Sequence, residues 1–318
     1  MGDLDTIASA AASAAQIEAG KAAEAARPIA DFLRKASFET TRLVPADLAA
    51  LQDRRADVAV YVSAAPSLPA EAQLEVATAL RAHGIEPIPH VAVRNFASAG
   101  ALAAWLARMA DRAGVRRALI IAGDRAEPAG PFHAAIDLIE SGLLQDHGIE
   151  EIGIAGYPDG HPRIAPLDLD RVLAAKIEAA DQTGLRVHLM TQFAFAAESI
   201  LRWLARLRDL GIDHPVRVGF AGPATLPDLL RFARVCGVKT SALALARNAG
   251  LARNMFALMT PDRLVRPVAE ACANGRYGEV APHFYSFGGL AATIRWATAA
   301  TAERIELDRA FGFSIAPP

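Results

Sequence analysis

The chain has 318 residues, of which 53% are hydrophobic and 21% charged, enough for one large α/β domain or two ordinary ones. Its formal net charge of -2 leaves no basic excess for phosphate contacts, which argues against a nucleic-acid-binding surface. Two cysteines, Cys236 and Cys272, form neither a disulfide framework nor a CxxC metal motif. No apolar run approaches the ~18 residues of a membrane span. Acidic residues near the N-terminus argue against a transit peptide, so we expect a cytoplasmic protein.

The chain alternates between strand and helix patterns after an alanine-rich start. Alanine favours helix, and Pro28 predicts that a helix begins near Ile29. Apolar segments of strand length are predicted as strands over residues 36–41, 57–63, 86–93, 117–124, 151–158, 186–193, 216–223 and 282–288. Helices are predicted over residues 45–54, 69–82, 98–113, 132–141, 168–183, 226–236 and 290–301, with another ending at 210 and a mostly helical stretch over 241–275.

Eight β-α units predict a (β/α)8 TIM barrel over residues 36–318, preceded by a helical extension over residues 1–35. The alternative is a doubly wound open sheet. It is disfavoured because no GxGxxG motif follows the first predicted strand, so the dinucleotide fingerprint of that fold is missing.

Polar residues stand at the C-terminal ends of the predicted strands, where a barrel carries its active site. Glu39 lies within the first strand, although barrel interiors are otherwise filled by branched apolar side chains, and it therefore indicates chemistry. The alternative is that Glu39 faces the surrounding helices and pairs with an arginine. The other strand-end residues are Ser63, His90, Asp124, Tyr157 with His161, Gln192, and Tyr285 with Ser286.

Two further kinds of site are disfavoured. A metal site could draw on His90, Asp124, His161 and His283, but the chain has no HxH on its first strand and no HExxH, so no metal is predicted. Lys176 lies in the middle of a predicted helix. An amine directed at a phosphate, or a solvated lysine, explains this position better than a Schiff base does.

The order of several short motifs resembles one enzyme family. The motifs are "SFE" (37–39), "PH" (89–90), "GD" (123–124), "AGYPDGHP" (155–162), Lys176, "TQF" (191–193) and "HFYS" (283–286). In this order they resemble methylenetetrahydrofolate reductase, over about residues 36–300. The most specific part is the YP-x-x-HP element followed by a helical lysine and then TQF.

The resemblance implies a (β/α)8 barrel that binds FAD at its strand ends. Such an enzyme passes a hydride from NAD(P)H through the flavin to 5,10-methylenetetrahydrofolate and forms 5-methyltetrahydrofolate. By this resemblance Glu39 is the general acid that protonates N10 and opens the five-membered ring. Asp124 supplies a negative charge that favours the cationic iminium, and the Gln192 amide hydrogen-bonds the pterin. The implied cofactor-binding residues are Ser63, His90, Asp124, Tyr157, His161 and Lys176.

The chain also departs from the family pattern at positions that touch ligands rather than the barrel. Residues that usually contact flavin or folate are replaced by Ala122, Val172, Ala175, Leu226 with Pro227, and Gly288 with Gly289. Retention of FAD is therefore open, as are the choice of NADH or NADPH, the physiological direction and the oligomeric state. Two alternatives follow: a flavin-independent reductase that takes hydride directly from NADH, and a non-catalytic barrel that binds folate or stabilises a partner subunit.

Overall fold

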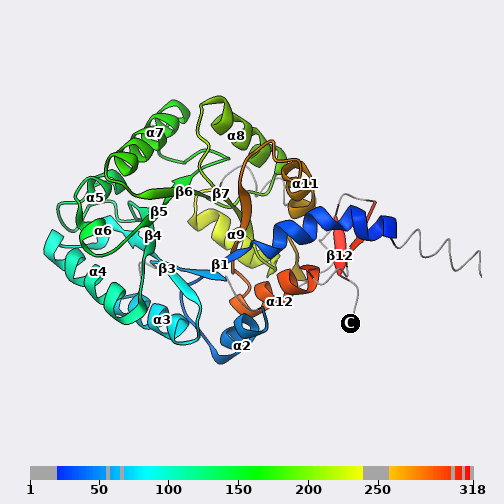
Figure 1. Cartoon of the computed structure of the whole chain (residues 1–318), viewed down its shortest axis with the longest axis horizontal. Coiled ribbons are helices and arrows are strands. Elements are labelled where there is room, and N and C mark those ends of the chain that lie inside the picture. The colour runs from blue at the N-terminus through cyan, green and yellow to red at the C-terminus, as the bar shows by residue number, and fades with distance from the viewer. Residues whose placement is uncertain are drawn as a thin grey trace, which may run out of the picture.

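Parallel strands form the centre of the computed structural model, which describes residues 20–54, 58–64, 68–238, 258–301, 305–309 and 312–315. Eight of them close into a barrel in the order β1-β10-β7-β6-β5-β4-β3-β2 (Figure 1). They are β1 (Ser37–Thr40), β2 (Ala59–Val62), β3 (Glu86–Ala92), β4 (Arg117–Ile121), β5 (Glu151–Gly156), β6 (Arg186–Thr191), β7 (Val216–Ala221) and β10 (Val280–Tyr285). Each lies within or overlaps a predicted strand, and the predicted TIM barrel is confirmed.

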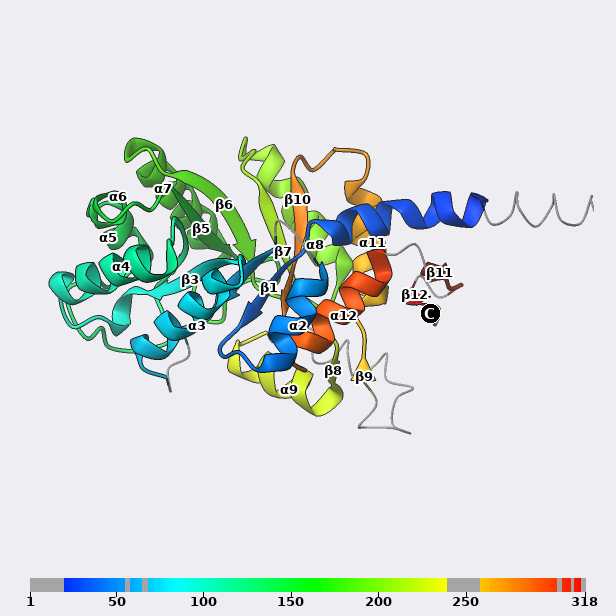
Figure 2. The same ribbon diagram turned by 60° about the horizontal axis from the view of Figure 1, so that its bottom comes forward.

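Helices surround the barrel and cover the outer face of its strands, except α9 (Leu226–Val235), which lies across one end of the barrel (Figures 1 and 2). They are α2 (Pro45–Arg54), α3 (Ala70–Ala82), α4 (Ala99–Ala113), α5 (Ala135–Ile139), α6 (Leu143–Asp146), α7 (Pro166–Gln182), α8 (Ala197–Asp209), α9 (Leu226–Val235), α11 (Asp262–Cys272) and α12 (Leu290–Thr301). The helix predicted over 132–141 is wrong in extent, since α5 ends at Ile139 and Gly142, at φ 78°, precedes the separate α6. No helix among the described residues meets the length and hydropathy needed to cross a membrane.

Three short elements complete the described chain. β8 (Ala224–Thr225) pairs antiparallel with β9 (Leu258–Met259), and β11 (Ile305–Leu307) pairs antiparallel with β12 (Phe313–Ile315). A 3-10 turn, η1 (Val93–Asn95), follows β3. Of the stretch predicted as mostly helical over 241–275, residues 241–257 lie outside the described residues, and the remainder contains β9 and α11.

Alternation along the strands divides the core into two layers. Phe38 and Phe284 lie on the outer face and stack with ring centroids 6.0 Å apart. Tyr61, Leu119 and Met190 belong to a smaller cluster inside the barrel. Because successive strand residues point to opposite faces, the neighbours of Phe38, which are Ser37 and Glu39, must point inward.

The strand starts fill the barrel interior with charged and polar side chains. Arg117 Nε donates to Glu86 Oε1 at 2.7 Å. His188 Nδ1 lies 2.8 Å from Glu151 Oε1, and its Nε2 lies 2.8 Å from the Tyr61 hydroxyl. Burial lowers the pKa of His188, so the ring is neutral near pH 7. A neutral ring that donates from Nδ1 to the Glu151 carboxylate accepts from the Tyr61 hydroxyl at Nε2. Both ring nitrogens and the hydroxyl then have a hydrogen-bond partner.

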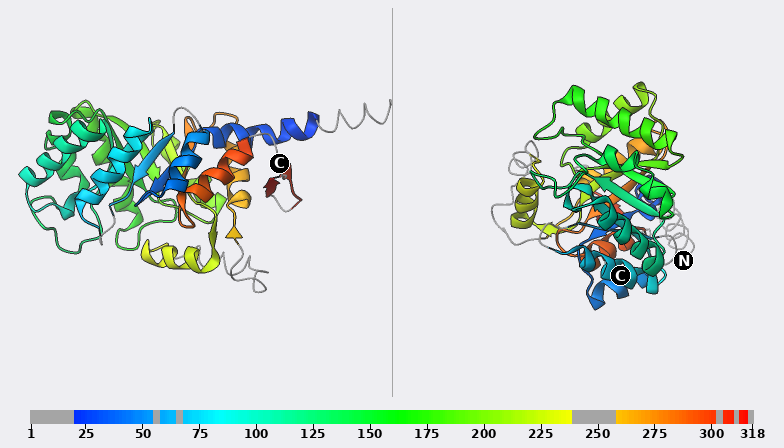
Figure 3. Two further views of the ribbon diagram at one scale, coloured as in Figure 1. Left: turned by 90° about the horizontal axis from the view of Figure 1, so that it is seen from below. Right: turned by 90° about the vertical axis from the view of Figure 1, so that its left-hand side faces the viewer.

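Residues 20–34 form a helix that docks on the barrel. Figures 2 and 3 show it beside α11 and α12, with its first turns projecting beyond the barrel. Ile29 and Leu33 are fully buried, and the Phe32 ring meets Phe220 edge-on at 6.2 Å. The prediction that a helix begins near Ile29 is wrong, because the helix continues through Pro28. Burial of this apolar face offsets the backbone hydrogen bond that proline cannot make. The division at residue 35 stays a prediction.

We expect Leu33→Ala to lower the free energy of unfolding by about 2–5 kcal/mol, as for other fully buried leucines. The reason is that Leu33 has no exposed surface and packs into the same core as the barrel strands. Urea unfolding followed by circular dichroism measures the change. Leu167→Ala is the matched control, because that side chain is 75% exposed and its loss should change stability by less than about 0.5 kcal/mol. Equal stabilities of the wild type and Leu33→Ala would show that the helix is not part of the folded unit.

Candidate active site at the barrel mouth

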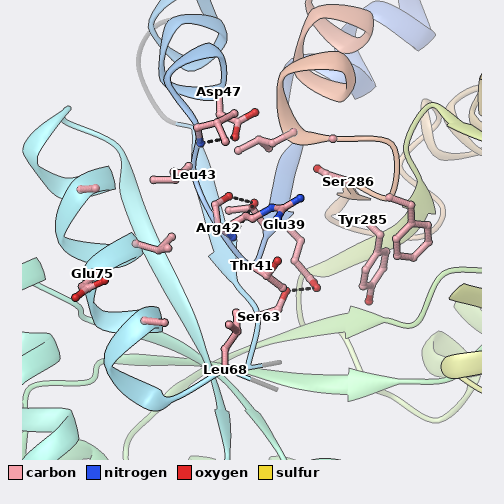
Figure 4. Close-up of a pocket in the computed structure, with 18 of the residues that line it drawn as sticks. Glu39, Thr41, Arg42, Leu43, Asp47, Ser63, Leu68, Glu75, Tyr285 and Ser286 are labelled. Carbon is pink, nitrogen blue, oxygen red and sulfur yellow. Dashed lines mark hydrogen bonds between the residues drawn. The ribbon is translucent and has the colours of Figure 1, made fainter. Parts of the chain in front are cut away.

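Glu39 occupies the inside of the barrel near the C-terminal ends of the strands, with its side chain only 15% exposed. Ser63 Oγ donates to Glu39 Oε1 at 2.5 Å. His90 Nε2 and His283 Nε2 each lie 3.4 Å from Glu39 Oε2. Figure 4 shows the Glu39 side chain between Ser63 and Tyr285. The alternative in which Glu39 faces the helices and pairs with an arginine is therefore wrong.

The strand register explains how these groups meet. In β1, Ser37 pairs with His283 of β10, and Glu39 pairs with Tyr285 of β10 and Tyr61 of β2. The motifs SFE and HFY thus lie side by side with the same alternation, phenylalanine outward and the two flanking residues inward. His283 Nδ1 also lies 3.0 Å from Ser37 Oγ, which fixes the orientation of the imidazole ring.

The charge state of this cluster follows from burial and hydrogen bonding. Burial acts to raise the pKa of Glu39, but His90, His283 and Ser63 act against it, and the net pKa lies below its ordinary value. Burial lowers the pKa of His90 and of His283, although Glu39 opposes that shift. Neutral imidazole and hydroxyl donors are enough to favour a carboxylate. The free protein near pH 7 therefore holds an ionised Glu39 between two neutral histidines.

Two neighbouring cavities lie at the barrel mouth, and Glu39 lines the larger of them. The larger, of about 890 Å³, is lined by Glu39, Arg42, Arg231, Phe232, Tyr285 and Phe287 among others (Figure 4). The smaller, of about 310 Å³, is lined by Gln73, His90, Asn95, Phe96 and Arg125 among others. Thr41, Ser63 and Leu68 line both cavities.

The remaining predicted residues lie in a second group on the β4 and β5 side. Tyr157 packs against the His161 ring at 4.9 Å and 74°. Burial and the charge of Asp124 raise the pKa of Tyr157, so Asp124 lies close to this tyrosine. Gln192 Oε1 accepts from the Phe193 N–H at 3.1 Å. The roles predicted for Asp124, Gln192, Tyr157 and His161 stay predictions.

Lys176 of α7 is half-buried. Burial lowers its pKa to about 8, and no hydrogen bond or ion pair joins it to another residue that the structure describes. An unpaired ammonium in such surroundings is unfavourable unless an anion compensates it. Its position therefore fits the predicted contact with a diphosphate.

Aromatic residues at the barrel mouth were missed by the sequence analysis. α9 lies across the end of the barrel at which the strands end (Figures 2 and 3). There Phe232 stacks on Phe287 with centroids 4.0 Å apart and planes at 11°, and the Arg231 guanidinium lies 4.8 Å from the Phe232 ring centre. Leu226 and Pro227 suggested that an aromatic had been lost. In the structure Phe232 supplies an aromatic ring instead. Counting helical turns from the cap at Thr225 could have predicted that Phe232 lies on the inward face of α9.

His283 and Cys236 also have different places from those expected. The sequence suggests His283 only as a metal ligand, whereas in the structure it hydrogen-bonds Glu39. No group of three or more potential ligands that could hold a metal occurs in the described chain. Cys236 reaches the same mouth, and burial together with the charges of Glu39 and Asp124 raises its pKa to about 12. It is therefore a neutral thiol at physiological pH, as is Cys272, whose pKa burial also raises to about 12.

Comparisons with known proteins indicate a single enzyme family. Residues 52–254 match the family model described as methylenetetrahydrofolate reductase. The chain is 31% identical over 128 residues to 5,10-methylenetetrahydrofolate reductase of Pectobacterium carotovorum subsp. carotovorum, covering 40% of this chain and 41% of that protein. It is 29% identical over 131 residues to the Escherichia coli (strain K12) protein of the same name, covering 41% and 42%. These matches span less than half of each relative.

A solved structure shares the fold. An uncharacterized protein from Clostridium thermocellum that binds two copies of 5-methyl-5,6,7,8-tetrahydrofolic acid aligns with a TM-score of 0.55 and 11% identity. The alignment covers 84% of this chain and 94% of that chain. At this identity the likeness supports the barrel fold alone.

Acid should destabilise the protein through its buried histidines. His90, His188 and His283 have pKa values below their ordinary value in the fold, so the unfolded chain binds more protons below about pH 6.5. The free energy of unfolding should therefore be highest above that pH. It should fall as the pH drops, by up to about 1.4 kcal/mol per pH unit for each histidine that stays neutral. Urea unfolding between pH 7.5 and 5.5 measures the slope. His83→Gln, at an exposed position, should keep that slope, and a flat profile for the wild type would contradict the assignment.

Lys176→Met should stabilise the protein at pH 7. The folded-state pKa of about 8 lies below the ordinary 10.5, so the charged amine opposes folding fully below pH 8 and progressively less up to 10.5. Removing it should raise the free energy of unfolding by up to about 3 kcal/mol at pH 7, with no gain near pH 11. The exposed Lys21→Met is the control. Equal gains for both variants would mean that Lys176 is solvated.

Proposed function

The chain belongs to the methylenetetrahydrofolate reductase family, and on that premise we propose that it interconverts 5,10-methylenetetrahydrofolate and 5-methyltetrahydrofolate, with NAD(P)H or NAD(P)+ as the hydride partner. The observation that carries the proposal is the largely buried carboxyl of Glu39 at the wall of the larger cavity, hydrogen-bonded by Ser63 and His283 and 3.4 Å from His90. A carboxyl so placed can exchange a proton with a ligand above it.

The chemistry needs one proton and one hydride. In the reductive direction Glu39, protonated as the ligand covers it, gives a proton to N10, and the N10–methylene bond breaks to leave an iminium at N5. A hydride from the dihydronicotinamide then adds to the methylene carbon, which becomes the methyl group. The sum is one methylenetetrahydrofolate, one NAD(P)H and one proton giving methyltetrahydrofolate and NAD(P)+. In the oxidative direction Glu39 accepts the proton.

The larger cavity suits the folate. Aromatic faces of Tyr285 and Phe287 can pack on the pterin and aminobenzoyl rings. Arg42 and Arg231 line the same cavity and can pair with the carboxylates of the glutamate tail. In this proposal Asp124 stabilises the cationic iminium and Gln192 binds the pterin edge, as the family resemblance implies.

FAD, which the family implies, can be tested against the residues predicted to hold it. Ser63 and His90 line the smaller cavity and face Glu39, whereas Tyr157, His161 and Lys176 line neither of the two cavities at the mouth. Tyr157 and His161 pack on each other. When FAD is bound, Ser63 and His90 would face it from the ends of β2 and β3, Tyr157 and His161 from the loop after β5, and Lys176 would supply a charge for the diphosphate. The steps given above use only groups of this chain and the two substrates.

Glu39→Gln should lower turnover with NADH and methylenetetrahydrofolate by about 10²–10⁴-fold, because the amide has the same shape but cannot supply the proton. Folate affinity, measured by fluorescence quenching, should change only a few-fold. Glu178→Gln makes the same chemical change at an exposed position on α7 and should keep full turnover. Unchanged turnover in Glu39→Gln would refute Glu39 as the acid. A wild type that binds folate but turns over no nucleotide would favour the non-catalytic barrel.

A further inference from the structure

Arg217 of β7 is an interior cation that takes no part in the steps proposed above. Phe220 faces outward, where it meets Phe32 edge-on, so the alternation of the strand directs Arg217 into the barrel. The side chain is half-buried, and its Nη1 donates to Ser37 Oγ at 3.4 Å. Among the described residues no carboxylate forms an ion pair with it. An interior charge of this kind acts strongly on its neighbours, because little solvent screens it.

A chain of hydrogen bonds leads from Arg217 to Glu39. The Ser37 Oγ that accepts from Arg217 lies 3.0 Å from His283 Nδ1. On the other side of the ring, His283 Nε2 lies 3.4 Å from Glu39 Oε2. Ser37 is 1% exposed and His283 is fully buried, so solvent water does not compete for these bonds. The guanidinium therefore reaches the proposed acid through two intervening side chains.

The chemistry of the two ends fixes the direction of every bond in this chain. A guanidinium can only donate, and an ionised carboxylate can only accept. The Ser37 hydroxyl accepts from Arg217 and has one hydrogen to give, which goes to His283 Nδ1. That nitrogen therefore carries no hydrogen in the neutral ring, and the ring hydrogen is on Nε2, facing Glu39. All donors point from Arg217 toward the carboxylate.

Glu39 and His283 compete for one proton, because two titratable groups in contact titrate as a pair. Burial is the largest cause of the low pKa of His283; Glu39 opposes the shift, and the charges of His90 and Arg217 add to it. A second hydrogen on His283 would have to sit on Nδ1, where it meets the Ser37 hydrogen and faces toward the cation. When the pair takes up a proton, a Glu39 oxygen is therefore the favoured place for it.

Neighbouring strands supply no comparable charge. The other titratable and charged groups that face this part of the interior are Tyr61 of β2, Glu86 and His90 of β3, Arg117 of β4, Glu151 of β5, His188 of β6 and Tyr285 of β10. Burial raises the pKa of both tyrosines, which stay neutral. Glu151 accompanies the neutral His188, and Arg117 is paired with Glu86. Of these interior groups, Arg217 is the cation that no described carboxylate neutralises.

We propose, on the basis of the function proposed above, that Arg217 is a positioning residue for the proton transfer. Acting through Ser37, it holds His283 with its hydrogen toward Glu39 and keeps the exchangeable proton of this pair on Glu39, the member that lines the ligand cavity. His283 does not pass protons from the barrel interior to Glu39, because the chain ends in a guanidinium, which does not release a proton. The proton given to N10 in the reductive direction therefore reaches Glu39 from the cavity side.

Nitrogen NMR of the full-length protein tests the proposal without any need for turnover. In protein labelled with ¹⁵N-histidine, the His283 signals are identified by their loss in His283→Gln. The ring nitrogens of the wild type should show the neutral Nε2–H form. Arg217→Met and Ser37→Ala should both raise the pKa of His283, because each removes a group that disfavours a hydrogen on Nδ1. Arg217→Lys keeps a charge and a donor and should titrate as the wild type does between about pH 5.5 and 8.

The pH dependence of turnover gives the second readout. With NADH and methylenetetrahydrofolate at pH 7, Arg217→Met should lower kcat by about tenfold, because a charged His283 weakens the hold of Glu39 on its proton. Its kcat profile should gain an inflection near the ordinary histidine pKa of about 6.5 that the wild type lacks. Arg217→Lys should restore both. Arg202→Met, at an exposed position on α8, should match the wild type, and circular dichroism checks the folding of each variant.

Three results would overturn the role of Arg217. They are an Nδ1–H form of His283 in the wild type, an unchanged His283 titration in Arg217→Met and Ser37→Ala, or a loss of turnover in Arg217→Met with the shape of the pH profile kept. The last would mean that Arg217 only supports the fold. A wild type without turnover would overturn the proposed function instead, and the NMR titration would still decide the state of His283.

Discussion

An ionised carboxyl inside a closed barrel is stable only if hydrogen-bond donors surround it. Leaving it without partners would cost several kcal/mol. Glu39 obtains those donors from Ser63 after β2 and His283 of β10, and the ring of His90 of β3 lies 3.4 Å from it. The carboxylate thus joins strands that lie at both ends of the chain, and the closing of the barrel and the building of the site are one event.

The rest of the interior supports this arrangement in layers. The strand starts carry the paired charges of Arg117 and Glu86, and above them His188 is held between Glu151 and Tyr61. The Tyr61 ring meets the His283 ring edge-on at 4.8 Å, so the lower layer supports the imidazole that holds Glu39. The interior is therefore a packed and largely polar column, which explains why small changes near Tyr61 would be felt at the mouth.

Local sequence patterns were sufficient for the barrel and for part of the site. Helix α12 matches its prediction at both ends, and an acid within an otherwise apolar barrel strand was enough to predict that Glu39 lies at the barrel mouth. The continuation of the first helix through Pro28 was not predictable, because it depends on burial against a barrel that the local pattern does not contain. The stack of Phe232 on Phe287 joins residues more than fifty positions apart, and no single segment indicates it.

The order of the motifs predicts the family, but it does not predict which residues line the same ligand cavity. Strand ends place Ser63, His90, Tyr157 and His161 at one mouth. The structure shows that the first two line a cavity, while the other two pack on each other. Which residues share a space depends on loop packing, and that is decided by contacts such as those of α9 with the segment after β10.

The pairing of β1 with β10 has a consequence for how the protein is made. Ser37 and His283 are 246 positions apart, and their contact is both the last seam of the barrel and the support of Glu39. A nascent chain whose first seven barrel strands have left the ribosome still lacks the pairing of β1 with β10. One edge of β1 therefore stays unpaired throughout synthesis. Such a nascent chain exposes backbone groups for a long interval, and the Glu39 carboxylate gains its His283 donor only after nearly the whole polypeptide has emerged.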